Sequence, residues 1–171
     1  MKVLFLDIDG VINSDDYAKR YHDEHLREKG YHIWVDPEAV ELVRQLCEKE
    51  HVKIILSSSW RSFDLEHTFT YLREYPGLKP LLKYIVGITP GSLTRCRGKE
   101  IQDFLDNYKL CAKNGLIKEK YKGEKIDKYA IVDDDSDMFE NQKPFFVQTD
   151  WFIGITKEDI EKLTNILKDE N

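Results

Sequence analysis

Short apolar runs alternate along this chain with segments in which apolar residues recur every three or four positions. Runs of mainly apolar residues occupy residues 3–6, 52–56, 84–88, 129–132 and 145–147. Runs of this length are typical of strands that are buried on both faces in a parallel sheet. We therefore predict five buried strands in this order along the chain.

The segments with helical periodicity begin at residues that are typical of helix N-termini. One helix is expected after residues 36–37, where an aspartate and a proline precede apolar residues at helical spacing. The other three are expected to begin at Ser62, near Lys99 and at Thr156, the last with a capping box. A Pro-Gly pair at residues 76–77 is expected to end the helix that Ser62 begins.

Strands that alternate with helices predict a doubly wound, Rossmann-like α/β fold with a parallel five-stranded sheet. The chain has 171 residues, which suits one domain. We therefore expect a single domain over residues 1–171. Residues 13–32 are polar and rich in histidine, and residues 109–128 are rich in lysine, so we expect both segments to be connections at the surface.

Charge and cysteine content exclude several classes of protein. Lys and Arg total 26 against 32 for Asp and Glu, a net charge of −6, which excludes histone-like binding through a global positive field. Cys47, Cys96 and Cys111 are too widely spaced for a zinc site or a disulfide framework, and favour a reducing compartment. No apolar run approaches the ~20 residues of a membrane helix, and Asp7 and Asp9 interrupt the only segment that resembles a signal peptide. We expect a cytoplasmic protein without a membrane partner.

Polar residues follow three of the predicted strands. Asp7 and Asp9 follow the first, Ser57 and Ser58 follow the second, and three aspartates at residues 133–135 follow the fourth. Ligands of open parallel sheets bind outside the carboxyl ends of the strands, where these side chains converge. Residues two apart in an extended segment point to the same side, so Asp7 and Asp9 can face one site.

The aspartates predict a site for a divalent cation. Neighbouring carboxylates repel one another unless a cation lies between them, and hard oxygen ligands of this kind favour Mg²⁺. A substrate phosphate is the ligand that such a cation can bridge, and Lys99 and the serine hydroxyls supply the charge and the donors that phosphoryl transfer needs. Asp7 is placed to attack phosphorus, and Asp9 to protonate the leaving oxygen and activate water.

The order of these motifs resembles that of haloacid dehalogenase-like (HAD) phosphohydrolases. Four features carry the resemblance over roughly residues 1–160: D-I-D-G-V at residues 7–11, a serine after the second strand, the basic Lys99, and the acidic group after residues 129–132. A narrower resemblance is to the HAD domains of Swiss Army knife RNA-repair proteins. It rests on the stretches LFLDIDGVIN, ILSSSWR, RGKEIQDFL, YAIVDDDSDM and FVQTDWFIGIT. A more distant resemblance is to the phosphatase module of polynucleotide kinase-phosphatases.

The resemblance implies a role for each of these residues. Asp7 would be the nucleophile and Asp9 the general acid and base, while Ser58 would bind the phosphate and Lys99 would clamp its charge. Asp7 and Asp134, with the backbone carbonyl of Asp9, would hold Mg²⁺. The presence of Asp9 argues against halide displacement, because the dehalogenases of this superfamily lack an aspartate there.

Two assignments at the phosphate have alternatives. Ser57 competes with Ser58, which is preferred because it keeps the narrower family's spacing to the Trp-Arg pair that follows. Arg97 competes with Lys99, and either cation could hold the phosphate. Arg61, the second member of the Trp-Arg pair, either reaches a second phosphate or a nucleotide, or forms a surface ion pair. The tryptophan of that pair is expected to be a packed aromatic rather than a base-stacking platform.

The acidic motif also has two versions. Asp133 and Asp134 fit the paired version, whereas Asp133 and Asp137 fit the version with acids four apart. We prefer Asp134 for direct contact with the metal, with Asp133 as its neighbour in the metal site.

The gaps between the motifs predict an essentially capless fold. Residues 13–35 are too few for an inserted domain, and residues 62–97 are mostly accounted for by a helix and a strand of the core. An open site favours a large substrate such as a protein or nucleic-acid end, or closure by another subunit of a homo-oligomer. The lysine-rich segment is a further candidate contact for nucleic acid, against an ordinary solvated loop.

These observations predict a Mg²⁺-dependent phosphomonoesterase that acts through an aspartyl-phosphate on the terminal phosphate of a nucleotide or nucleic acid. One alternative is a response-regulator receiver, which shares the sheet, an acidic Mg²⁺ pocket, a Ser or Thr and a Lys. The motif order argues against it, because in a receiver the acidic pair follows the first strand and the phosphorylated aspartate the third. The other alternative is a catalytically silent module that binds phosphate or nucleic acid.

Overall fold

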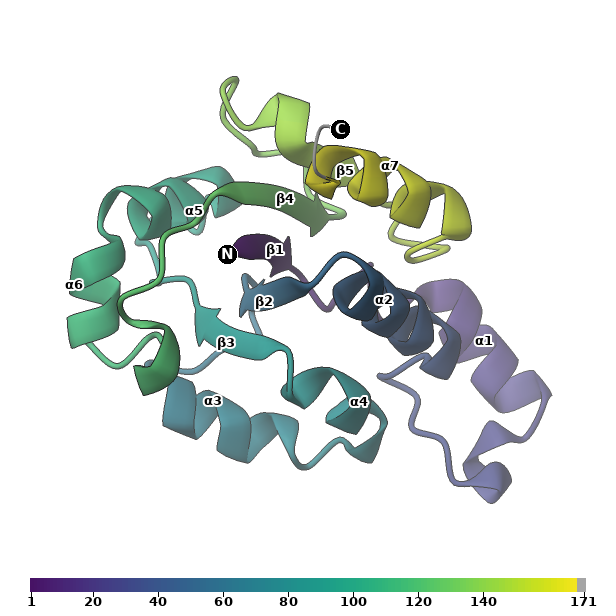
Figure 1. Ribbon diagram of the computed structural model, residues 1–171. Helices are drawn as coiled ribbons and strands as arrows, with labels where there is room; N and C mark the ends of the chain where they lie inside the picture. The colour runs from purple at the N-terminus through teal and green to yellow at the C-terminus, as the bar shows by residue number, and fades with distance from the viewer. Residues whose placement is uncertain (169–171) are drawn as a thin grey trace.

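The five predicted strands form one parallel sheet in the structure, a computed structural model that describes residues 1–168. The strands are β1 (Lys2–Leu6), β2 (Val52–Leu56), β3 (Ile85–Ile88), β4 (Lys128–Asp133) and β5 (Phe146–Gln148). Their order across the sheet is β3-β2-β1-β4-β5, and every neighbouring pair is parallel (Figure 1). The predicted α/β fold with a five-stranded parallel sheet is therefore confirmed.

The strand order separates this chain from response-regulator receivers. Their sheet has the order 2-1-3-4-5, whereas the order 3-2-1-4-5 is that of a Rossmann-type sheet. In this chain β1 lies at the centre, between β2 and β4. The receiver alternative is therefore wrong.

Helices cover both faces of the sheet, which explains why the strands are mostly apolar. Helices α2 (Pro37–Lys49) and α7 (Lys157–Leu167) lie side by side along one face (Figure 1). Helix α5 (Arg97–Asp106) lies on the other, where its Phe104 ring meets the Phe5 ring edge to face at 5.6 Å. The remaining elements are α1 (Asp15–Asp23), α3 (Leu65–Leu72), α4 (Lys79–Leu82), α6 (Tyr108–Lys113) and the 3₁₀ turns η1 (Leu26–Lys29), η2 (Pro76–Leu78), η3 (Glu119–Tyr121) and η4 (Lys143–Phe145).

Two of the four predicted helix starts are confirmed and two need correction. Asp36 caps α2, and Thr156 caps α7 within a complete capping box. Helix α3 is capped by Asp64 rather than by Ser62, because the Asp64 carboxylate is the group that accepts a backbone N–H of the first turn. Helix α5 begins at Arg97, two residues earlier than predicted.

The two segments predicted to be surface connections both contain regular structure. Residues 13–32 include α1, whose N-terminus is capped by Ser14, and η1. Residues 109–128 include η3 and most of α6, and their Leu116 and Ile117 are buried. The first insertion thus amounts to α1 and η1, in agreement with the predicted capless fold. No helix within residues 1–168 has both the length and the apolar content needed to cross a bilayer.

Candidate functional site

The strand register aligns four polar residues across the carboxyl edge of the sheet. One paired row consists of Ile88, Leu56, Leu6 and Val132. The residues that follow them are Thr89, Ser57, Asp7 and Asp133. Paired residues of parallel strands point to the same side of a sheet, so these four side chains form one row, which we call the polar row.

Three oxygen atoms of the polar row are buried without a hydrogen-bond partner. They are Asp7 Oδ1, Ser57 Oγ and Thr89 Oγ1, and no other buried side-chain oxygen or nitrogen of residues 1–168 is in this state. Buried polar atoms are nearly always satisfied, so each exception needs an explanation. A polar ligand bound at this edge would supply all three missing partners.

An acidic cluster lies at one end of the polar row. Asp7, Asp133 and Asp134 bring carboxylate oxygens within 4.8 Å of one another. Burial raises the pKa of Asp7 to about 6, against the opposing effects of the Arg97 guanidinium and the Ser58 hydroxyl. Burial and the neighbouring Asp7 raise the pKa of Asp133 to about 8, and burial raises the pKa of Asp134. Three carboxylates that the protein leaves under-neutralised fit a hard divalent cation such as Mg²⁺.

Gly10 allows Asp134 to lie against the loop that follows β1. Its φ is +68°, and a Cβ at this position would lie 2.5 Å from Asp134 Cγ. Its carbonyl oxygen accepts a hydrogen bond from Thr149 Oγ1 at 2.8 Å, which fixes this loop to the segment after β5. Glycine is therefore required here both for the backbone conformation and for the approach of the carboxylate.

Arg97 is the cation that reaches the acidic cluster. Its Nε donates to Asp133 Oδ2 at 3.0 Å, its Nη1 donates to Glu100 at 3.1 Å, and its Nη2 lies 3.6 Å from Asp7 Oδ1. Lys99, the predicted clamp, instead forms an ion pair with Asp103 at 2.6 Å on the surface of α5. The structure therefore brings Arg97, and not Lys99, to the predicted nucleophile.

The helix phase explains this difference. Residues two apart in an α-helix point in nearly opposite directions, and α5 begins at Arg97. Arg97 therefore faces the sheet edge at the first turn, whereas Lys99 faces away from it and pairs with the residue one turn later.

The structure also distinguishes the two versions of the acidic motif. The Asp137 carboxylate accepts the backbone N–H of Arg97 at 2.8 Å, so it caps the N-terminus of α5 and stands outside the acidic cluster. Both oxygens of Asp133 are engaged, by Arg97 Nε and by the backbone N–H of Asp135, each at 3.0 Å. Asp134 is therefore the better placed of these acids for direct contact with a metal.

Asp9 stands at the mouth of the site and is exposed. Its carboxylate accepts hydrogen bonds from Asn13 Nδ2 at 2.9 Å, Ser59 Oγ at 3.0 Å and Trp60 Nε1 at 3.0 Å. The Trp60 ring also packs against Tyr75, with centroids 4.7 Å apart. Trp60 is therefore packed as predicted, but the sequence analysis missed its second role as a donor to Asp9.

Ser57 and Ser58 both lie at the site but in different ways. The Ser58 side chain is fully buried, interacts with the Asp7 carboxylate and accepts the backbone N–H of Trp60 at 3.3 Å. The Ser57 hydroxyl has no partner and belongs to the polar row. Arg61 is neither free nor on the surface, because its Nη2 pairs with the buried Glu100 at 2.7 Å.

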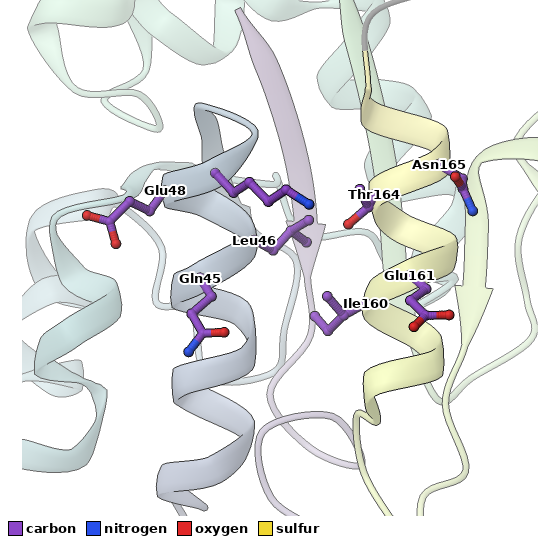
Figure 2. A pocket seen from close by; sticks show the side chains of 8 residues that line it. Gln45, Leu46, Glu48, Ile160, Glu161, Thr164 and Asn165 are labelled. Atoms are coloured by element: carbon purple, nitrogen blue, oxygen red, sulfur yellow. The ribbon is translucent and has the colours of Figure 1, made fainter.

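A polar groove between α2 and α7 lies away from these residues. Its volume is about 660 Å³, and Leu46 and Ile160 point toward one another across it (Figure 2). None of the predicted site residues lines it. The groove therefore separates two packed helices and adds nothing to the candidate site.

The last part of the lysine-rich segment lies at the opposite edge of the sheet. Residues 125–127 bond to the N-terminal residue, which precedes β1, so they lie at the amino ends of the strands. The Lys118 ammonium sits 4.4 Å from the Phe69 ring centroid, and Lys122 pairs with Glu119 at 2.6 Å. These lysines are therefore not part of the site at the carboxyl edge.

Comparison with known proteins identifies the family. The family described as the HAD domain in Swiss Army Knife RNA repair proteins matches residues 3–160. No curated protein and no solved structure matches this chain. The matched span begins in β1 and ends in α7, so it includes the polar row and the acidic cluster. The chain therefore belongs to the family of HAD domains in Swiss Army Knife RNA repair proteins.

Proposed function

We propose that this protein is a Mg²⁺-dependent phosphomonoesterase that acts through an aspartyl-phosphate on the terminal phosphate of a nucleotide or nucleic acid. The observation that carries the proposal is the polar row, where three buried oxygens without partners adjoin an acidic cluster and a partly buried arginine. A phosphate needs both a cation and short hydrogen-bond donors, and this edge of the sheet supplies them. Membership of an RNA-repair family supports a nucleic-acid end as substrate.

The metal would be held by oxygen atoms that follow β1 and β4. The carboxylates of Asp7 and Asp134 and the backbone carbonyl of Asp9 are its proposed ligands, with Asp133 beside them. When bound, Mg²⁺ neutralises the carboxylates and the substrate phosphate, so that two anions can approach each other.

Arg97 and the serine hydroxyls bind and orient the phosphate. The Arg97 guanidinium, at the first residue of α5, is fixed by Asp133 and Glu100. One of its nitrogens lies 3.6 Å from Asp7 Oδ1. The unpartnered Ser57 hydroxyl donates to a phosphate oxygen, and the Ser58 hydroxyl turns from Asp7 to a second phosphate oxygen when the substrate binds. This arrangement stabilises charge on the transferred group without reorganisation during the reaction.

In the first step, an oxygen of the Asp7 carboxylate attacks phosphorus and forms the aspartyl-phosphate. The bond from phosphorus to the leaving oxygen breaks, and that oxygen takes a proton from the Asp9 carboxylic acid. In the second step, Asp9 removes a proton from water, which attacks the same phosphorus. The bond between phosphorus and the Asp7 oxygen breaks, inorganic phosphate leaves, and both aspartates return to their starting states.

The first test is phosphate release in the presence of Mg²⁺, comparing wild type with Asp7→Asn. The substrates are p-nitrophenyl phosphate, mononucleotides, and oligonucleotides that carry a 3′ or a 5′ terminal phosphate. We expect turnover by wild type, loss of turnover in the variant and a preference that names the substrate class. Turnover by Asp7→Asn equal to that of wild type would refute the covalent mechanism. If wild type hydrolyses none of these substrates, the silent binding module is the correct description.

A further inference from the structure

A second cavity opens beside the candidate active site, over the carboxyl ends of β2 and β3. Its volume is about 750 Å³, within the range of cavities that hold ligands of nucleotide size. Its lining combines three arginines, two acids, several hydroxyl and amide groups, and one exposed aromatic ring. We call it the distal cavity.

The distal cavity is continuous with the site of the proposed reaction. Arg97 lines it and also lies 3.6 Å from Asp7 Oδ1. Ser59 lines it and also donates to the Asp9 carboxylate at 3.0 Å. A group attached to a phosphate at Asp7 would therefore extend into this cavity.

Thr89 places an unsatisfied polar atom in the wall of the distal cavity. It is only 1% exposed, its Oγ1 has no hydrogen-bond partner, and it lines the cavity. It lies two strands from Asp7 in the polar row, roughly 10 Å away by the spacing of neighbouring strands. The Thr89 hydroxyl is thus a buried group without a hydrogen-bond partner that lies beyond the position of the reacting phosphate.

Arg95 supplies a cation that is not used elsewhere in the described chain. Of the three arginines that line the cavity, Arg61 pairs with Glu100 at 2.7 Å, and Arg97 pairs with Asp133 at 3.0 Å. The Arg95 side chain is exposed, and no ion pair or hydrogen bond within residues 1–168 engages it. Its backbone has a φ of +54°, a left-handed conformation that residues with a side chain rarely adopt.

Phe63 presents an aromatic surface on the rim of the same cavity. It is 74% exposed, and its ring is held by His67, with centroids 4.2 Å apart. An exposed aromatic ring beside a cation-lined groove is the combination with which proteins bind single-stranded nucleic acids. In an unstacked strand the nucleobase is free to lie on such a ring.

We propose that the distal cavity binds the nucleotide next to the reacting phosphate in a single-stranded nucleic acid. Arg95 contacts the first internucleotide phosphate, Phe63 stacks on the base, and the Thr89 hydroxyl forms a hydrogen bond with the ligand. This inference rests on the proposed function, because it takes the reacting phosphate to lie at Asp7. It makes Arg95 the residue that distinguishes a nucleic-acid end from a mononucleotide.

The test uses two dinucleotides that carry the same terminal phosphate. In one the internucleotide linkage is a phosphodiester, and in the other it is an uncharged methylphosphonate; each is made with the terminal phosphate at the 3′ or at the 5′ end. We expect wild type to prefer the charged linkage by about tenfold in kcat/KM, because the contact is charge-assisted. Arg95→Gln should abolish that preference while keeping the rate on the methylphosphonate, and Arg95→Lys should restore part of it.

A variant of Phe63 tests the role of its ring, and a variant of Arg27 controls for the loss of one positive charge. Phe63→Ala should reduce kcat/KM on the dinucleotide by about fivefold or more, and should have little effect on an analogue in which the nucleotide that carries the terminal phosphate lacks its base. Arg27→Gln removes an exposed arginine on η1 that does not line the cavity, and should behave as wild type. If wild type does not distinguish the linkages, or if Arg95→Gln keeps the preference, the proposal is wrong.

A binding measurement separates failure of this proposal from failure of the proposed function. If wild type hydrolyses no substrate, dissociation constants of both dinucleotides are measured for wild type and Arg95→Gln. Tighter binding of the charged linkage that depends on Arg95 would support the distal cavity even without turnover. Equal affinities would overturn it.

Discussion

The indole N–H of Trp60 donates to both oxygens of the Asp9 carboxylate, at 3.0 and 3.1 Å. The ring itself is held by Tyr75 and Tyr71, with centroid distances of 4.7 and 5.8 Å. A proposed general acid on an exposed loop is thus oriented by a tryptophan that the packing of other aromatic rings fixes. This relationship makes Trp60 a positioning residue, because it would act on the reaction only through Asp9.

Replacing this donor should affect substrates according to their leaving groups. Trp60→Phe keeps an aromatic ring at this position but removes the hydrogen bond, so we expect kcat to fall by about tenfold for alkyl phosphates, whose leaving oxygen needs a proton. For p-nitrophenyl phosphate the loss should stay below about threefold, since p-nitrophenolate leaves without one. Tyr71→Phe is the matched control, because it touches the same ring without contacting Asp9. If kcat falls equally on both substrates, Trp60 does not position Asp9 as the general acid.

Substitutions of Asp9 and Asp134 should both lower activity, but only the substitution of Asp134 should lower the affinity for Mg²⁺. Asp9→Asn should lower turnover at least about a hundredfold, because it removes the proton donor. Its affinity for Mg²⁺ should remain close to that of wild type, since its proposed metal ligand is the backbone carbonyl. Asp134→Asn should lose Mg²⁺ affinity together with activity. Titration calorimetry with Mg²⁺ checks both variants, and a loss of metal binding in Asp9→Asn would contradict the assigned role.

Substitutions of Arg97 and Lys99 should have very different effects on kcat/KM. Arg97→Gln should reduce kcat/KM by about a hundredfold or more, because it removes the cation that faces the transferred phosphate. Lys99→Gln should remain within about twofold of wild type, since it breaks only an exposed ion pair with Asp103. Arg97→Lys keeps a positive charge among Asp7, Asp133 and Glu100 and is the variant to use if Arg97→Gln does not fold. If Lys99→Gln instead lowers kcat/KM more than Arg97→Gln does, Lys99 is the residue that clamps the charge of the phosphate.

Without a divalent cation, the protein should become less stable as pH rises. The pKa of Asp133 is raised to about 8 and that of Asp7 to about 6, so the folded state favours the protonated carboxyls. Such groups contribute stability below about pH 4 that is lost as pH rises through their folded pKa values. We expect the free energy of unfolding in a chelator to fall between about pH 4 and pH 8, and Mg²⁺ to restore it more at about pH 8 than at about pH 5. Denaturant titrations that show no such slope would contradict the assigned burial.

Gly10→Ala should weaken the metal site more than it weakens the fold. The left-handed backbone costs about 1 kcal/mol for alanine, and the new Cβ would collide with Asp134. We expect Mg²⁺ affinity to fall by about tenfold because a ligand is displaced. Gly30→Ala is the matched control, since Gly30 has a φ of +83° but a Cβ added there would have no neighbouring atom within 4 Å. Equal Mg²⁺ affinity in the two variants would refute a role for Asp134 as ligand.

The strands and the position of Asp7 at the end of the first could be predicted from the sequence because a single physical cause governs them. A strand covered on both faces is mostly apolar, so its carboxyl end is marked by the polar residue that follows its buried apolar run, as at Asp7 and Ser57. Helix α1 could not be predicted in this way because only Tyr17 of its residues is buried, which leaves almost no apolar period. Its start is nevertheless marked by Ser14 followed by two aspartates.

The choices at the site that the sequence leaves open depend on contacts between segments that are far apart in the chain. Arg97 can be preferred over Lys99 only once the first residue of α5 is known, and Asp137 sets that start from the loop after β4. In the same way, the bond from Trp60 to Asp9 joins two loops whose conformations no local pattern specifies. Sequence reasoning identifies the set of candidate residues, and the tertiary contacts select among them.

The polar row also determines when the candidate site can assemble as the protein folds. Its members come from four strands separated by long stretches of chain, and β1 meets β4 only after most of the chain is available. Contacts of such long sequence separation are among the slowest to form. During refolding, helical content should therefore recover before Mg²⁺ binding does, and a chain interrupted before β4 should contain much of the sheet yet no metal site.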